Sequence, residues 1–288
     1  MKIVNVMISR VMGGIEQAFL YYNAAFESLG YEVLSVIDKK SAVINEVQTP
    51  KLSIKFEKYN PLLILKLYFA LKKFMPDMII VHQKKAIPLF KIAAKMLGAT
   101  IIGVAHNPKI KRLEKCDAVF SVTQNQKDKM ITQGLKNVPV YAVPNMIKIP
   151  AREPKFQPFH TPIIVGTMGR FEPIKGFCDI FVLPSLEESF GMVLLEAALA
   201  KKPLICSDAA GPNEVWANTG AALVFERGNA EMLADKLAEM AANPIMARNM
   251  SEKAYRHVKE NYGVASVAKV LKEALDKVTK EEIQYPEQ

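Results

Sequence analysis

A short acidic loop containing Glu188 and Gly191 stands between an apolar run and a helix-forming segment. Residues 180–183 predict a buried strand, and residues 192–200 predict a helix with Ser189 as its N-cap. Open α/β sheets bind ligands beyond the carboxyl ends of their strands, and a helix N-terminus favours anions. We therefore expect this loop to bind a ligand, with the helix N-terminus as a site for phosphate.

Glu188 has a second acidic partner, Glu196, eight positions further along the chain. At a rise of about 1.5 Å per helical residue, the two carboxylates are about 10 Å apart. They could hold two parts of one elongated ligand. A glycosidase fits less well, because its carboxylate pair spans one bond at about 5–9.5 Å. The simplest alternative is an ordinary strand–loop–helix with solvated carboxylates.

A second cluster of candidate residues precedes this loop. Residues 163–168 predict a strand, after which come Arg170 and then Lys175. A guanidinium can bind phosphate with two parallel hydrogen bonds, and an ammonium acts as a point charge. The pair therefore suits a diphosphate, although a spacing of five residues means little by itself.

The first half offers three candidate positions, each after a predicted strand. Gly13 and Gly14 separate a strand from a helix, an arrangement that lets the backbone approach a phosphate or a sugar. His82 and His106 each end an apolar run, where a cleft would open. A histidine there is as often a buried hydrogen-bonding residue as an active one.

Alternating strands and helices must position these residues, which indicates parallel, doubly wound α/β sheets. In the first half we predict strands over residues 2–9, 32–37, 52–56, 78–82, 100–105, 118–122 and 140–143, with helices over 15–29, 61–75, 86–97 and 126–134. In the second half we predict strands over 163–168, 180–183, 204–206 and 221–224, with helices over 192–200, 230–242, 247–261 and 264–279.

Positive charge is concentrated in the first half of the chain. Residues 1–150 contain 22 Lys and Arg against 10 Asp and Glu, whereas the remainder has 16 against 19. Residues 61–75 form an amphipathic, cationic helix, and a basic loop follows His106. This asymmetry favours an anionic partner such as a membrane surface or a phosphorylated acceptor, although a solvated basic surface is the plain alternative. No aromatic–basic interleaving indicates nucleic acid.

The remaining composition favours a cytoplasmic protein without a cofactor. Three widely spaced cysteines suit a reducing compartment, and neither an Asp-x-Asp motif nor a His/Cys cluster indicates a metal. Residues 1–9 predict a strand rather than a signal peptide, and the lysines of residues 62–75 interrupt the longest apolar run.

The Glu188-x7-Glu196 spacing, with Phe190-Gly191 inside it and Gly211-Pro-Asn-Glu214 after it, resembles the signature of retaining GT-B glycosyltransferases of family 4. Gly13-Gly14-x-Glu16 resembles the start of the same enzymes. The resemblance implies two Rossmann-like domains, and it implies transfer of a sugar from a nucleotide-diphosphate sugar of the UDP or GDP type. The acceptor would be a saccharide or glycolipid, as in bacterial envelope polysaccharide or lipopolysaccharide synthesis.

The resemblance also implies roles for single residues. Arg170 and Lys175 would neutralise the leaving diphosphate, which is an electrostatic contribution to catalysis. Glu196 would hold the ribose hydroxyls. His106 would lie against the sugar from the other lobe.

Further residues would surround the donor sugar. Glu188 would bind it together with backbone amides near Phe190, Gly191 and Met192. The loop at Gly13 and Gly14 would approach it from the first domain.

The predicted organisation has four parts. Residues 1–145 form an acceptor-side domain, 146–160 a linker, 161–262 a donor domain, and 263–288 a helix and tail that pack back towards the first domain. After Gly176 the family continues with further strand–helix units, whereas this chain runs directly to Asp179. The donor domain is therefore abbreviated. This leaves a second hypothesis open, a non-catalytic or impaired remnant that acts as a binding or membrane-associated protein.

Overall fold

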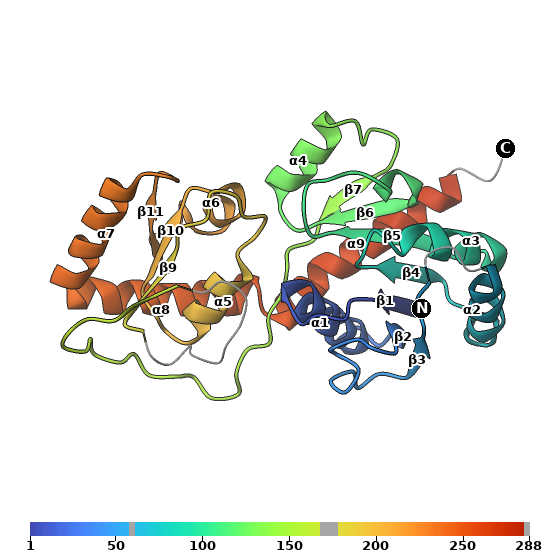
Figure 1. Ribbon diagram of the computed structural model, residues 1–288, viewed down its shortest axis with the longest axis horizontal. Coiled ribbons are helices and arrows are strands. Elements are labelled where there is room, and N and C mark those ends of the chain that lie inside the picture. The colour runs from blue at the N-terminus through green and yellow to red at the C-terminus, as the bar shows by residue number, and fades with distance from the viewer. Residues whose placement is uncertain (58–60, 168–177, 285–288) are drawn as a thin grey trace. The chain divides into compact units, whose positions relative to one another are not determined.

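The computed structural model describes residues 1–57, 61–167 and 178–284, which divide into two compact units (Figure 1). The first unit comprises residues 1–146 together with the segment from Val267 onward. The second comprises residues 147–266. Both are α/β units built on parallel sheets, as the alternating pattern predicts.

The first unit contains every strand and helix predicted for the first half, with ends that differ by at most two residues. Its elements are β1 (Lys2–Met7), α1 (Gly14–Ser28), β2 (Glu32–Asp38), β3 (Lys51–Ile54), α2 (Pro61–Phe74), β4 (Met78–Val81), α3 (Ile87–Leu97), β5 (Thr100–Ala105), the 3-10 turn η1 (Leu113–Lys115), β6 (Ala118–Ser121), α4 (Gln124–Thr132) and β7 (Val140–Ala142).

The strands of the first unit lie in the order β3-β2-β1-β4-β5-β6-β7, all parallel. The chain builds outward from β1 to β3, returns to the other side of β1 with β4, and then builds outward again. The order therefore reverses between β1 and β4. Helices that leave neighbouring strands on opposite faces at such a point open a crevice, where α/β sheets bind ligands.

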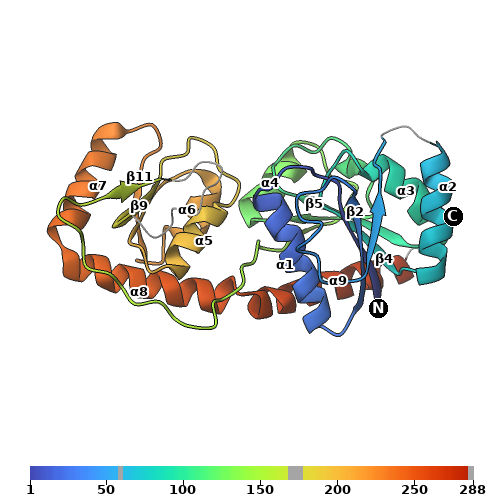
Figure 2. The same cartoon turned by 60° about the horizontal axis from the view of Figure 1, so that its bottom comes forward.

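The two faces of this sheet are covered by different helices. Val4 and Val6 of β1 face a core cluster that includes Leu67 of α2 and Phe90 of α3, whereas Met7 packs in a cluster with Phe19 of α1. Side chains on a strand alternate between faces, so β1 supplies both layers. Figure 2 shows α1 apart from the pair α2 and α3. The first sheet is therefore doubly wound.

The second unit is built on a sheet of four described strands in the order β11-β10-β9-β8, again parallel. The apolar side chains of Ile180, Val182 and Ile205 pack against Met240 and Met250. Its elements are β8 (Val165–Gly166), β9 (Ile180–Leu183), α5 (Met192–Leu199), β10 (Leu204–Ser207), α6 (Ala210–Trp216), β11 (Ala222–Phe225), α7 (Ala230–Ala242) and α8 (Pro244–Asn261).

The last helix, α9 (Val264–Gln284), begins at the end of the second unit and belongs to the first from Val267 onward. Its buried residues Val267, Leu271, Leu275 and Val278 recur every three or four positions and so form one apolar stripe. Within the described ranges, no helix is both long enough and apolar enough to cross a membrane.

Candidate functional site

The acidic loop of the second unit lies between β9 and α5, beyond the carboxyl end of the strand. Glu188 is half-buried, and its Oε1 accepts hydrogen bonds from the backbone N–H groups of Ser189 at 2.9 Å and Phe190 at 3.3 Å. The Glu188 carboxylate is thus hydrogen-bonded to the backbone of its own loop. The amide of Phe190, one of those that the resemblance assigns to the donor sugar, is hydrogen-bonded to Glu188 in this arrangement.

The start of α5 differs from the prediction that Ser189 caps it. The N-cap is Gly191, whose φ of 89° lies in the left-handed region, and the helix begins at Met192. Glycine adopts that conformation without the steric penalty of a side chain. The prediction was wrong because the chain needs a sharp turn between Glu188 and Met192, and a left-handed glycine makes that turn.

A second glycine connects this loop to the one after β10. A Cβ atom on Gly211 would lie 2.4 Å from the backbone nitrogen of Phe190, so only glycine fits without movement of the backbone. The N–H of Gly211 donates to the carbonyl of Glu188 at 3.0 Å. At the strand ends, the Ser207 hydroxyl donates to the carbonyl of Ser185 at 2.6 Å. Two adjacent strands therefore hold the Glu188 loop in place.

The other predicted donor residues lie on the same segment. Phe190 is buried, and its ring meets that of Tyr262 edge-on with centroids 5.6 Å apart, so its side chain packs in the interior. Met192 and Glu196 are half-buried on the first two turns of α5. Arg170 and Lys175 lie outside the described residues.

In the first unit, the carboxyl ends of β4 and β5 bring two histidines together. His82 Nδ1 lies 3.2 Å from His106 Nε2, and the two ring planes are 21° apart. His82 is buried, whereas His106 is half-buried. Burial lowers the pKa of His106 to about 3, with a smaller contribution from Lys84, and burial also lowers the pKa of His82. Both imidazoles are therefore neutral at pH 7.

Lys84, which was not predicted, holds the loop that carries His106. Its Nζ donates to the side-chain oxygen of Asn107 at 2.7 Å, to the carbonyl of Asn107 at 3.2 Å and to the carbonyl of Lys109. Burial, and then the nearby charge of Lys109, lower the pKa of Lys84 to about 8. The sequence feature that could have indicated Lys84 is its position two residues after His82, at the end of the same strand.

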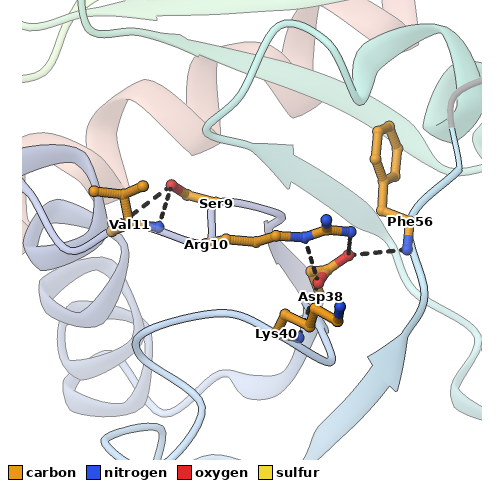
Figure 3. A network of polar contacts seen from close by, with 6 residues as sticks. All are labelled: Ser9, Arg10, Val11, Asp38, Lys40 and Phe56. Carbon is orange, nitrogen blue, oxygen red and sulfur yellow. Dashed lines mark hydrogen bonds and ion pairs between the residues drawn. The ribbon is translucent and has the colours of Figure 1, made fainter.

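The loop after β1, which leads to Gly13 and Gly14, is fixed by a pair that was also not predicted (Figure 3). Arg10 makes two hydrogen bonds to Asp38 at 3.1 and 3.2 Å, and Asp38 also accepts from the N–H groups of Lys40 and Phe56. Burial raises the pKa of Asp38, but these hydrogen bonds more than offset it, so the pKa lies below its usual value.

Gly13 is the N-cap of α1 and Gly14 is the first residue of that helix. The backbone at Gly13 is extended, so its φ does not require glycine. A Cβ atom there would lie 2.9 Å from the carboxylate of the buried Glu16, so glycine provides room beside that side chain. In the ranges 1–57, 61–167 and 178–284, no three His, Cys, Asp or Glu side chains are arranged to hold a metal ion.

Two parallel α/β units, each with its candidate residues at the carboxyl edge of a sheet, are the arrangement of GT-B proteins. The family described as "Glycosyltransferase Family 4" matches residues 12–149, and the family described as "Glycosyl transferases group 1" matches residues 163–257. The chain belongs to the GT-B glycosyltransferases of group 1 and family 4. The predicted family and fold class are confirmed.

Curated relatives agree with this family, and a solved structure has the same fold. The chain is 34% identical to an N-acetylgalactosaminyltransferase acting on N,N'-diacetylbacillosaminyl-diphospho-undecaprenol of Campylobacter jejuni, over 27% of this chain and 20% of that protein. It is 29% identical to the lipopolysaccharide core mannosyltransferase LpcC of Rhizobium leguminosarum, over 32% and 26%. The structure of Anabaena HepE in complex with UDP and glucose matches with a TM-score of 0.78 at 14% identity, covering 96% of this chain and 100% of that one. The matches to curated relatives span 26% or less of those proteins.

Proposed function

We propose that this chain transfers a sugar from a nucleotide-diphosphate sugar, with retention of configuration, to a saccharide or glycolipid acceptor of a bacterial envelope. The observation that carries the proposal is the Glu188 loop, which Gly191 and Gly211 hold at the carboxyl edge of β9 and β10. It lies within the residues that the group 1 family matches. The UDP bound to HepE, a protein of the same fold, favours a UDP-type donor, with GDP as the alternative.

In this proposal the candidate residues have the roles that the resemblance implies. Arg170 and Lys175 neutralise the diphosphate as it leaves, Glu196 holds the ribose, and Glu188 holds the donor sugar. Glu188 must turn away from the N–H groups of Ser189 and Phe190 for those amides to bind a ligand. His106 follows β5, and the loop at Gly13 and Gly14 follows β1, so both lie at the carboxyl edge of the first sheet. No metal or other cofactor is proposed.

The test is calorimetric titration of the purified chain with UDP- and GDP-sugars. We expect saturable binding of one nucleotide class, with Glu188→Ala and Arg170→Ala each reducing affinity at least tenfold. Glu187→Ala is the matched control, because Glu187 is an exposed neighbour of the same type. Transfer to a lipid-linked or free saccharide would then establish the reaction. If no nucleotide sugar binds, the proposal fails.

A second function, binding without transfer, is favoured by the exposed edge of the second sheet, which has four strands among the described residues. Ile163, Ile164 and Val165 at its β8 edge are 36%, 42% and 50% exposed, which is unusual for three consecutive apolar residues beside a strand. Binding of a nucleotide sugar without any product would support this second function over transfer.

We further propose that the first unit binds to an anionic membrane surface. Leu62, Leu65 and Phe69 of α2 are 64%, 49% and 62% exposed and lie on one helical face, with the exposed Lys66, Lys72 and Lys73 on the same helix. α3, which packs against α2, exposes Ile92 and Met96. Apolar side chains framed by lysines suit insertion among anionic lipid headgroups.

A further inference from the structure

A line of buried polar side chains runs from the interior of the first unit to His106. His82 Nε2 lies 3.0 Å from Asn5 Oδ1, Asn5 donates to Asn23 Oδ1 at 2.8 Å, and Asn23 donates to Ser35 Oγ at 2.9 Å. Ser35 in turn is 2.7 Å from the hydroxyl of Thr49. All five of these residues are at most 4% exposed. None of them carries a charge at neutral pH, and none belongs to the roles described above.

The direction of every hydrogen bond from Asn5 to His106 follows from one backbone carbonyl. The Nδ2 of Asn5 donates to the carbonyl of Phe19 at 3.2 Å, and a carbonyl can only accept, so the orientation of the Asn5 amide is fixed. Its second N–H donates to Asn23. Asn5 Oδ1 therefore faces His82 as an acceptor, and His82 Nε2 must carry the hydrogen that it donates.

The same logic extends to the second imidazole. His82 is neutral, so a hydrogen on Nε2 leaves Nδ1 without one, and Nδ1 can only accept. His106 Nε2, 3.2 Å away, must then carry the hydrogen of that bond. The remaining nitrogen of His106, Nδ1, has a lone pair, and no group among the described residues donates to it.

We propose that His82 and Asn5 are positioning residues that lock His106 in its Nε2–H tautomer, so that His106 presents an acceptor, and not a donor, to the ligand. The ligand group that this nitrogen recognises is a hydroxyl, the donor most abundant on a sugar. This assignment of the ligand rests on the proposed function, in which His106 lies against the donor sugar. The tautomer itself does not.

The geometry distinguishes this role from simple packing. Phe19 and Tyr22 already meet the His82 ring edge-on, with centroids 5.7 and 4.8 Å away, so an apolar side chain of similar size could fill the space. An apolar side chain could not orient His106. A leucine at position 82 would leave His106 Nε2 without an acceptor, whereas a glutamine could still donate to Asn5 and accept from His106.

The decisive measurement is long-range ¹H–¹⁵N correlation NMR on the folded, ligand-free chain at pH 7, with ¹⁵N-labelled histidine. We expect both His82 and His106 to show the pattern of a hydrogen on Nε2, each as a single species. A hydrogen on Nδ1 of His106, or a mixture of tautomers in the wild-type chain, would overturn the proposal.

Two variants separate positioning from packing. We expect His82→Gln to keep the Nε2–H tautomer of His106, and His82→Leu to lose it and give a mixture. The spectrum itself reports whether each variant is folded. If His82→Gln and His82→Leu leave the His106 tautomer equally unchanged, His82 does not position it and the proposal is wrong.

The ligand assignment is tested separately by titration of the same sample with UDP-glucose. A change in the His106 Nδ1 signal with Nε2 still protonated supports a hydroxyl donated to Nδ1. If the nucleotide sugar binds and the Nδ1 signal does not move, the hydroxyl assignment is wrong. If neither UDP-glucose nor any other UDP- or GDP-sugar binds while the tautomer is as expected, the proposed function fails and the positioning role stands.

Discussion

At the scale of single residues, burial decides the protonation of His82 and His106. Their imidazoles share a hydrogen bond and stack on each other, and Phe19 and Tyr22 meet the His82 ring edge-on. The charge of Lys84 further disfavours a proton on His106. Both pKa values lie below the ordinary value near 6.5. The unfolded chain can therefore take up two protons that the folded chain refuses, which couples the stability of the first unit to acid.

We predict that the first unit loses stability as the pH falls below about 6.5. The contribution is complete above that value, because both states are then neutral. Below it, each imidazole lowers the free energy of unfolding by about 1.4 kcal/mol per pH unit until its folded pKa is reached, which for His106 is about 3. Amide hydrogen exchange of β1 and β4 between pH 4 and 7 measures how the free energy of unfolding changes with pH.

The matched variant for this prediction is His82→Gln, which removes one titrating group and keeps both hydrogen bonds. The free energy of unfolding of this variant should fall less steeply with decreasing pH than that of the wild type, by the contribution of one proton. Carboxylates that titrate below pH 5 affect both proteins equally and cancel in the comparison. Identical slopes would mean that His82 does not resist protonation.

At the scale of elements, two glycines join neighbouring strand–helix connections into one loop cluster. Gly191 allows the turn into α5, and Gly211 lets α6 approach the backbone of Phe190. The hydrogen bond from Gly211 N to Glu188 O then places the acidic loop relative to β10. The position of Glu188 therefore depends on a residue that follows it by more than twenty positions.

We predict that Gly211→Ala destabilises the second unit by about 1–3 kcal/mol, because the methyl group overlaps the backbone of residues 189 and 190. Nucleotide-sugar affinity should fall more than stability alone explains, because the Glu188 loop must shift. The single tryptophan, Trp216, is buried in this unit and its fluorescence reports unfolding. Ala210→Ser, at the exposed preceding residue, is the control and should change neither property.

At the scale of the whole molecule, the excess of positive charge over residues 1–150 coincides with exposed apolar side chains on α2 and α3. On α2, the exposed Leu65 and Phe69 lie one turn apart, and Lys72 also contacts the ring of Tyr68, 5.5 Å from its centroid. In the membrane proposal, charge attracts the first unit to an anionic surface, and the exposed apolar side chains of α2 then insert among the headgroups.

We predict that the chain binds vesicles containing anionic lipid and that Leu65→Ser with Phe69→Ser weakens binding at least tenfold in a flotation assay. Raising the salt concentration should weaken binding of the wild type, because the electrostatic part is screened. Ile245→Ser is the control, since Ile245 on α8 of the second unit is 79% exposed and apolar as well. Equal binding to neutral vesicles would contradict the electrostatic account.

Much of the fold could be predicted because each element has a local signature. Strand β5 and helix α7 have the predicted bounds, since an unbroken apolar run and a periodic helix-forming segment are marked by their own residues. The start of α5 could not be predicted in this way. Serine and glycine are both common N-cap residues. Only the path of the chain between Glu188 and Met192 decides which of Ser189 and Gly191 is the N-cap of α5.

Some residues of the candidate site could likewise be predicted from the sequence, and others could not. His82 and His106 could be singled out from sequence because each ends an apolar run. Asn5 could not, although a lone amide inside the strand Lys2–Met7 was a signal. Its partners Phe19, Asn23 and His82 are 14, 18 and 77 positions away in the chain, and only the pairing of β1 with β4 and the packing of α1 bring them together.

The sequence by itself determined the family, the parallel α/β architecture and the positions of the Glu188 loop, because motifs and periodicity are properties of neighbouring residues. Only the tertiary structure decided which nitrogen of His106 is protonated, why position 211 is glycine and how Arg10 fixes the loop after β1. Those properties arise from distances between residues far apart in the chain. Such distances exist only once the sheets have formed.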